Sequence, residues 1–197
     1  MRKNFIIIIT SSIIFIAILM SLYIFPIVLM NKNKALKQMF PDADKINEVN
    51  KTMTAAQMAN IKKRLGGKLY MHSPPRRGGL NKATFYFGIK ANKNIGVAMI
   101  EEQNDSKWGM VEFIVVMDRR TGAVKNMAMM SYIDRRARLI ARRSFLRQFW
   151  RKKISDPIAV YKDIVAISGA TVSTATTCFI VKKAVVSYYE IFLKKSK

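Results

Sequence analysis

A run of 26 residues without a charge, from Phe5 to Met30, constrains most strongly how this 197-residue chain can fold. As a helix, a segment of this length would span roughly 39 Å, enough to cross a hydrocarbon core of about 30 Å with some tilt. A secretory signal peptide is the competing interpretation, but its apolar core would be shorter, and no small-residue cleavage site follows the run. The sequence therefore predicts an uncleaved transmembrane helix within residues 1–30.

The residues after Met30 carry almost all of the charge. They contain 33 of the 35 lysines and arginines and all 12 acidic residues, which gives this part of the chain a net charge of +21. A field of this sign attracts anionic partners such as nucleic acid, lipid head groups or an acidic protein surface. The charges do not decide the orientation in the membrane, because Arg2 and Lys3 precede the apolar run and three lysines follow it closely.

The chain contains one cysteine, Cys178, and one histidine, His72. Neither a disulfide framework nor a zinc site of thiolates and imidazoles can be built from this pair. The sequence also lacks a haem-attachment motif and an iron–sulfur ligand set. A redox function would therefore need an organic cofactor.

Residues 31–67 are expected to form a helical stalk next to the membrane. Pro41 divides this segment, and Thr54 with Gln57 three residues later is typical of a capping box at the start of a helix. Apolar residues follow at helical spacing, and a pair of glycines ends the run. Residues 68–197 are then expected to form the α+β domain.

An antiparallel β-meander is the predicted centre of that domain. Four short β-rich runs, separated by turn signals, lie between residues 83 and 132: "ATFYFGI", "IGVAMIEE", "MVEFIVVMD" and "AVKNMAMMSY". Helical periodicity returns over residues 136–152, "IAVYKDIVAI" (158–167) is expected to be a final strand, and a closing helix follows residue 171. Two lysines in the middle of this last helix argue against a second membrane span.

The stretch "AISGATVST", residues 166–174, is uncharged and contains a cluster of hydroxyls. Gly169 permits backbone angles and close approaches that a Cβ would forbid. Thr171, Ser173 and Thr174 supply hydroxyls where a helix begins, and the amides and dipole of a helix start favour an anion such as phosphate. The alternative is that Ser168 or Thr171 only caps the helix.

The order of these elements, with "SFLRQFWRKK" (144–153) followed by "AISGATVST", resembles the FMN-binding domain family. Members of that family include the G subunit of Rnf electron-transport complexes, the C subunit of the sodium-pumping NADH:quinone oxidoreductase and the flavin domain of membrane regulators of nitrous oxide reductase. The resemblance covers roughly residues 63–188, which is most of the chain after the apolar run.

In that family a flavin transferase, with FAD as donor, joins FMN by a phosphoester bond to the threonine of an [ST]-G-A-T motif. The resemblance implies that Thr171 is the acceptor, and that Asp134 is the acid of a turn after the meander. The family usually has an aspartate three residues before the motif, where this chain has Val165. The neighbours of the phosphate implied by the resemblance are Ser168, Gly169, Ala170, Ser173 and Thr174.

The function implied by the resemblance is electron relay through FMN, as one subunit of a membrane redox complex and not as a complete enzyme. The family holds this domain on the extracytoplasmic face, which predicts a single-pass protein of the cell membrane with a cytoplasmic N-terminus. The alternative is a flavin-free structural or docking subunit that uses its basic surface, in line with the valine at position 165.

Nine basic residues lie between Arg135 and Lys153, the densest charge run of the chain. They are expected to form a solvated helix face, or a docking surface for a neighbouring subunit or an acidic redox protein such as a cytochrome or a ferredoxin-like carrier. Lipid head groups are a further option. Nucleic acid is disfavoured, because no known reading module accompanies the charge.

Overall fold

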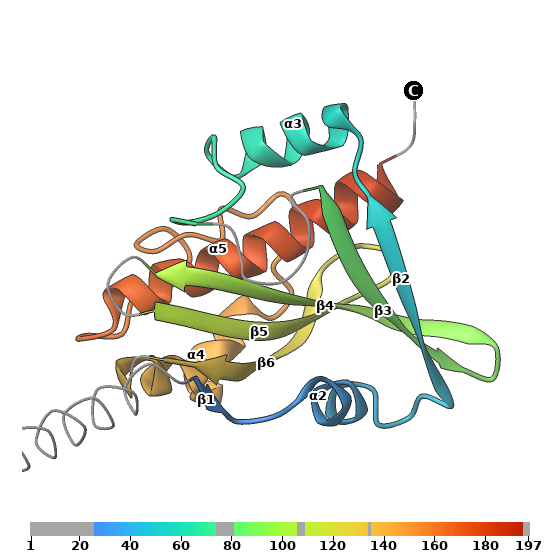
Figure 1. Cartoon of the computed structure of the whole chain (residues 1–197), viewed down its shortest axis with the longest axis horizontal. Helices are drawn as coiled ribbons and strands as arrows, with labels where there is room; N and C mark the ends of the chain where they lie inside the picture. Colours follow the sequence, from blue (N-terminus) through green and yellow to red (C-terminus); the bar gives the residue numbers. More distant parts are fainter. Residues whose placement is uncertain (1–25, 74–80, 106–108, 134, 195–197) are drawn as a thin grey trace, which may run out of the picture.

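The four β-rich runs form the middle of a six-stranded antiparallel sheet with the order β1-β6-β5-β4-β3-β2, which confirms the meander and the α+β class (Figure 1). The computed structural model describes residues 26–73, 81–105, 109–133 and 135–194. The strands are β1 Ile27–Val28, β2 Lys45–Thr52, β3 Lys82–Lys90, β4 Lys93–Asp105, β5 Gly109–Met117 and β6 Val124–Tyr132.

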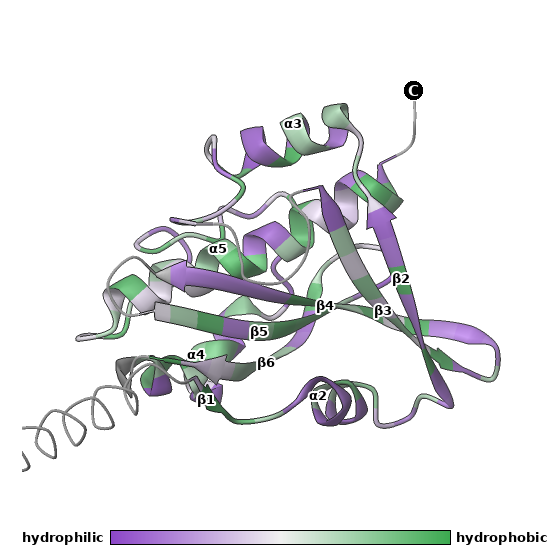
Figure 2. Cartoon of the chain, viewed as in Figure 1, coloured by the Kyte–Doolittle hydropathy of each residue, from purple (hydrophilic) through white to green (hydrophobic). Residues whose placement is uncertain are grey.

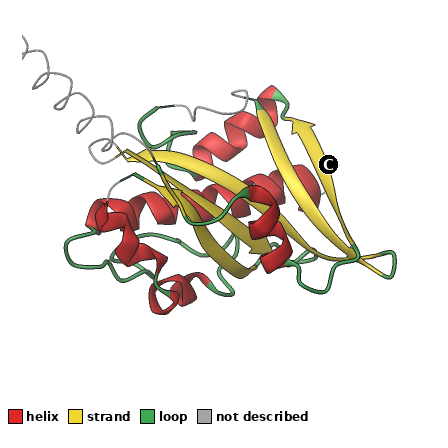
Figure 3. Ribbon diagram, turned by 60° about the horizontal axis from the view of Figure 1, so that its bottom comes forward, coloured by secondary structure: helices red, strands yellow, loops and turns green. Residues whose placement is uncertain are grey.

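Helices cover both faces of this sheet (Figure 3). The closing helix is confirmed as α5, which runs for 18 residues and continues into the π-helical turn η3. The helical elements are α2 Lys32–Met39, α3 Ala55–Arg64, η1 Arg135–Ala141, α4 Arg143–Leu146, η2 Arg147–Phe149, α5 Thr171–Tyr188 and η3 Tyr189–Leu193.

The alternation of side chains along the strands produces two apolar layers. One layer packs against α5, where Ile180 and Ala184 are fully buried against residues such as Phe113 of β5. The other layer packs against α2, which buries Leu36 and neighbouring apolar residues on the opposite face of the sheet. Figure 2 shows the contrast with the edge strand β2, which is mostly hydrophilic.

The prediction of a helical stalk over residues 31–67 is wrong in its middle part. Residues 45–52 form strand β2, which pairs with β3 from Lys45↔Ile89 to Thr52↔Lys82. The capping box of Thr54 and Gln57 is confirmed at the start of α3. The whole segment thus belongs to the fold, because α2 packs on the sheet, β2 extends it and α3 lies near the end of α5.

The end of the apolar run is part of the sheet as well. Residues 26–30 were included in the predicted transmembrane helix, but Ile27 and Val28 form β1 and pair with Tyr132 and Ser131 of β6. The rest of that predicted helix, residues 1–25, lies outside the described residues. Within the described part of the chain, no helix has the length and apolar character that a membrane crossing requires.

Two predictions between the meander and α5 are also wrong. The expected continuous helix over 136–152 is divided into η1, α4 and η2, and the backbone leaves helical geometry at Arg142, where φ is −65° and ψ is 134°. The expected strand over 158–167 is a loop whose strand-like pairing is a single bridge between Val160 and Ile164. The carboxylate of Asp163 stabilises this loop, because it accepts hydrogen bonds from the backbone N–H groups of Ile158 and Ala159.

Candidate functional site

The turn that leads into α5 is built around Gly169, whose φ of +76° lies in the left-handed region that favours glycine. The N–H of Ala170 donates to the carbonyl of Ile167 at 2.9 Å and closes the turn. Ala170 is the N-cap residue, and its side chain makes no capping hydrogen bond. Neither Ser168 nor Thr171 therefore occupies the N-cap position, so the capping alternative is not what the structure shows.

The hydroxyl cluster divides into two groups with different surroundings. Ser168 and Thr171 are exposed, whereas Ser173 and Thr174 are buried. The hydroxyl of Thr174 donates to the Ala170 carbonyl at 2.9 Å and accepts from the N–H of Ile167 at 3.4 Å. The buried pair thus belongs to the interior, and the side chain of Thr174 fixes the shape of the turn.

The exposed side of the turn is open to solvent. A Cβ placed on Gly169 would meet no atom within 4 Å, and Ala170 directs its small side chain into the core. Thr171 is the first residue of α5, where the positive end of the helix dipole and the backbone N–H groups of the first turn favour an anion. The arrangement can therefore bring a phosphate and an accessible hydroxyl to the same place.

Gln148 holds the loop just before this turn, and sequence reasoning did not identify it. Its side-chain amide pairs with the backbone of Val165 in both directions, accepting from the N–H at 2.8 Å and donating to the carbonyl at 3.3 Å. The Val165 side chain itself is 74 % exposed. Although Gln148 belongs to the quoted stretch "SFLRQFWRKK", nothing in its spacing indicated a partner 17 residues away.

Asp163 lies two residues before Val165 and has a structural role. Besides its two backbone hydrogen bonds, its carboxylate lies 2.9 Å from Nζ of Lys152. Partial burial raises the pKa of Asp163, but the two N–H donors and the lysine outweigh it, so the pKa is lowered overall. Asp134, the other acid implied by the resemblance, lies outside the described residues.

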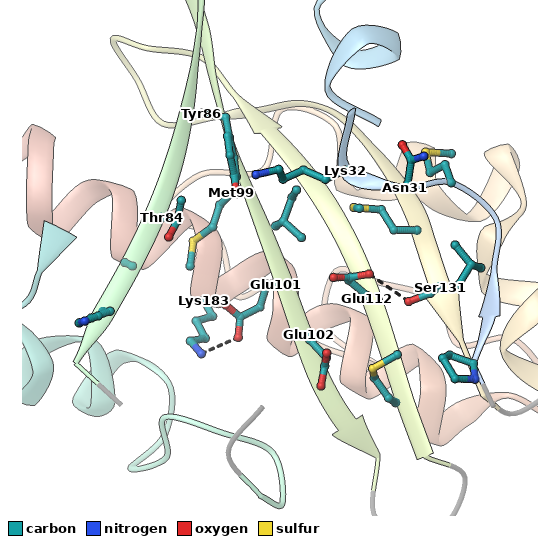
Figure 4. A pocket seen from close by; sticks show the side chains of 18 of the residues that line it. Asn31, Lys32, Thr84, Tyr86, Met99, Glu101, Glu102, Glu112, Ser131 and Lys183 are labelled. Carbon is teal, nitrogen blue, oxygen red and sulfur yellow. Dashed lines mark hydrogen bonds and ion pairs between the residues drawn. The ribbon is translucent and has the colours of Figure 1, made fainter. Parts of the chain in front are cut away.

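A cavity of about 480 Å³ opens beside β4, near the place where β3 separates from it (Figure 4). The pairing of these two strands ends at Phe85↔Met99, whereas β4 continues to Asp105. Cavities of this size with mixed linings can hold small organic molecules. The polar part of the lining includes Lys32, Thr84, Glu101, Glu102, Glu112 and Ser131.

One wall of the cavity contains a buried network of charged and polar groups. Nζ of Lys183 and the side-chain amide of Gln103 both donate to Oε1 of Glu101. The Lys183 ammonium also lies 4.3 Å from the centre of the Tyr70 ring. Gln103 completes the network by accepting a hydrogen bond from the N–H of Met71. This network explains why a lysine is tolerated on the buried side of α5.

The cavity and the turn at Gly169 are separate sites. Lys183 follows Thr171 by twelve residues on the same helix, which corresponds to a separation of roughly 18 Å along the axis. None of the residues of the turn lines the cavity. No protein-family model matches the chain, and no curated protein is found to be related to it.

Proposed function

We propose that this chain is a single-pass membrane flavoprotein that relays electrons through an FMN joined to Thr171. The observation that carries the proposal is the position of Thr171, whose exposed hydroxyl lies on the first residue of an 18-residue helix with no side-chain cap. The sequence motif supports it, because "SGAT" at this position is what the FMN-binding domain family uses.

The residues present fit a phosphoester at this place. The Gly169 turn leaves free space, the exposed Ser168 offers a second hydroxyl, and the N–H groups at the start of α5 are suited to phosphate oxygens. Thr171 would carry the bond, Ser168 would lie beside the phosphate, and Thr174 would hold the turn from the interior. FMN supplies the ability to exchange one or two electrons, so it can link a two-electron donor to one-electron carriers.

The partners follow from the same proposal. The protein would work as an electron-transfer subunit of a larger membrane redox complex and not as a complete enzyme, and a flavin transferase would attach the cofactor. The net charge of +21 after Met30 favours an acidic redox protein, such as a cytochrome or a ferredoxin-like carrier, as the electron partner. We place the domain on the extracytoplasmic face, with residues 5–25 as the anchor and Pro26 at its end.

A flavin-free docking subunit is the second candidate. The observation that favours it is the exposed, uncharged side chain of Val165, which stands where the family usually presents an aspartate. A transferase that reads that aspartate would then leave Thr171 unmodified.

The test is to co-express the full chain with a flavin transferase and to measure its intact mass. The wild type should gain the mass of one FMN, and Thr171→Ala should not gain it. Ser155→Ala is the matched control, because it removes an exposed hydroxyl outside the motif and should retain the added mass. An unmodified wild type without flavin absorbance in the native state would support the docking subunit, whereas absorbance without added mass would indicate FMN bound without a covalent link.

A further inference from the structure

Six basic residues with exposed side chains are distributed along η1, α4, η2 and the turn after them. We call these six residues the cationic segment. No acidic residue occurs anywhere between positions 135 and 155. The members of the cationic segment are Arg138, Arg142, Arg143, Arg147, Arg151 and Lys153.

Within the described residues, the cationic segment combines charges that form no ion pair with an exposed indole ring. Among the ion pairs between described residues, none involves a member of the segment, whereas Lys152 within the same stretch pairs with Asp163. Trp150 lies within the segment with 38 % of its surface exposed, and the Arg147 guanidinium lies 5.5 Å from the centre of its ring. Exposed indole rings together with arginines are typical of surfaces that contact lipid head groups.

The fold places the start of this region next to the point where the described chain begins. Ile27 of β1 pairs with Tyr132, the last residue of β6, and η1 begins three residues later (Figure 1). The edge of the sheet at this place is apolar, because Ile27, Val28 and Leu29 are all large exposed hydrophobic residues. The uncharged run that precedes Pro26 therefore joins the domain beside the first turns of this basic region.

We propose that the cationic segment, with Trp150, lies against the anionic head groups of the membrane in which the chain is anchored. The proposal rests on the membrane anchor of the proposed function, but not on the flavin. An anionic lipid surface suits these observations better than an acidic protein, because the basic region begins beside the apolar edge at β1, where the uncharged run arrives, and ends at the exposed indole next to Val124, at the other end of β6. The domain would then be held at the membrane both by its N-terminal anchor and by the cationic segment.

The experiment uses the full chain in lipid nanodiscs, with Trp108→Phe so that Trp150 is the remaining tryptophan. A quencher carried at head-group depth reports whether the ring touches lipid. Quenching should be at least about twofold stronger in discs that contain phosphatidylglycerol than in discs of phosphatidylcholine alone. It should fall towards the phosphatidylcholine level at about 1 M salt, where the screening length is about 3 Å.

Two variants with equal charge loss separate a specific contact from a general charge effect. Arg138→Gln, Arg142→Gln and Arg143→Gln together should abolish the gain produced by phosphatidylglycerol. Lys62→Gln, Lys63→Gln and Lys68→Gln, at exposed positions on and just after α3, should preserve it.

Three results would overturn the inference. Equal quenching in both kinds of disc would leave the cationic segment free for an acidic protein or for solvent. Equal losses in the two triple variants would reduce the effect to net charge. Failure of the chain to enter the discs would remove the anchor of the proposed function as well, whereas the intact-mass test of Thr171 would be unaffected.

Discussion

The ammonium of Lys183 on α5 lies 2.5 Å from Oε1 of Glu101 on β4, and both residues are buried. The two residues are 82 positions apart in the chain. Their ion pair therefore fastens the middle of the long helix to the sheet near the place where β3 has left β4. The same pair forms part of the cavity wall, so the stability of the domain and the shape of the cavity depend on one contact.

We expect Lys183→Met to lower the free energy of unfolding by roughly 3–5 kcal/mol, because it leaves the Glu101 carboxylate buried without its cation. Urea unfolding of the full chain in detergent, followed by circular dichroism, measures this loss. Lys182→Met is the matched control on the neighbouring, less buried position and should cost less than about 1 kcal/mol. Adding Glu101→Gln to Lys183→Met should recover stability, and purely additive losses would argue against a coupled pair.

Gly88 provides a second prediction, on the opposite face of the sheet. A Cβ at this position of β3 would lie 2.6 Å from Cδ1 of the Phe40 ring, which is itself buried at the end of α2. Gly88→Ala should therefore cost about 1–3 kcal/mol, since the ring must move in a packed layer. Combining it with Phe40→Leu should remove most of the added cost in a denaturation experiment. A Gly88→Ala protein as stable as the wild type would show that α2 does not pack as described.

The lowered pKa of Asp163 predicts that the stability of the protein depends on pH. Its pKa is lowered in the folded protein, so its carboxylate contributes stability that is present above the unfolded pKa of about 3.9 and is lost as the pH falls through the folded value. Asp163→Asn should cost about 1–3 kcal/mol at pH 7. The difference in unfolding free energy between wild type and variant should be constant down to about pH 5 and should shrink below about pH 4. If the difference in unfolding free energy grew on acidification, the stabilising role of the Asp163 carboxylate would be contradicted.

Val165→Asp tests the link between the loop and flavin attachment. The side chain at this position is 74 % exposed, and Gln148 binds its backbone only, so the substitution should not affect stability by more than about 0.5 kcal/mol. If the transferase reads an aspartate there, covalent labelling of Thr171 should become faster in the variant. Flavin fluorescence of the denatured protein in a gel gives the rate. Tyr161→Asp, at another exposed position of the same loop, is the control that introduces the same charge elsewhere.

Cys178 should be unreactive in the folded protein. Burial raises the pKa of its thiol to about 12, because the thiolate would lie in an apolar layer beside α5. A thiol-specific disulfide reagent at pH 8 should therefore label the chain only after denaturation. Rapid labelling of the native protein would mean that α5 opens far more readily than its packing indicates.

The central strands and the closing helix could be predicted from the sequence, because each has a local signal. Apolar alternation separated by turn residues identified β3 to β6, and a closing helix was expected after residue 171, where α5 begins. The capping box at Thr54 could also be predicted, because it depends on residues only three positions apart. These features require no knowledge of distant partners.

The errors arose where distant contacts decide the structure. The sequence "KINEVNKT" of β2 is polar because it is an edge strand, and only its hydrogen bonds to β3 make it a strand. The apolar stretch before the turn has strand-like composition, but the Asp163 carboxylate binds its backbone N–H groups and fixes a loop instead. Gln148 was missed for the same reason, since its partner Val165 is identified only by the folded chain.

The pairing of Ile27 with Tyr132 has a mechanical consequence for the molecule. A flexible linker after residue 25 would let the domain swing freely, but here the chain enters the sheet directly through β1 and its hydrogen bonds to β6. Any displacement of β1 is then transmitted to β6, and through Tyr132 to the region that begins with η1. With the anchor of the proposed function, the domain would therefore move together with that anchor instead of swinging freely.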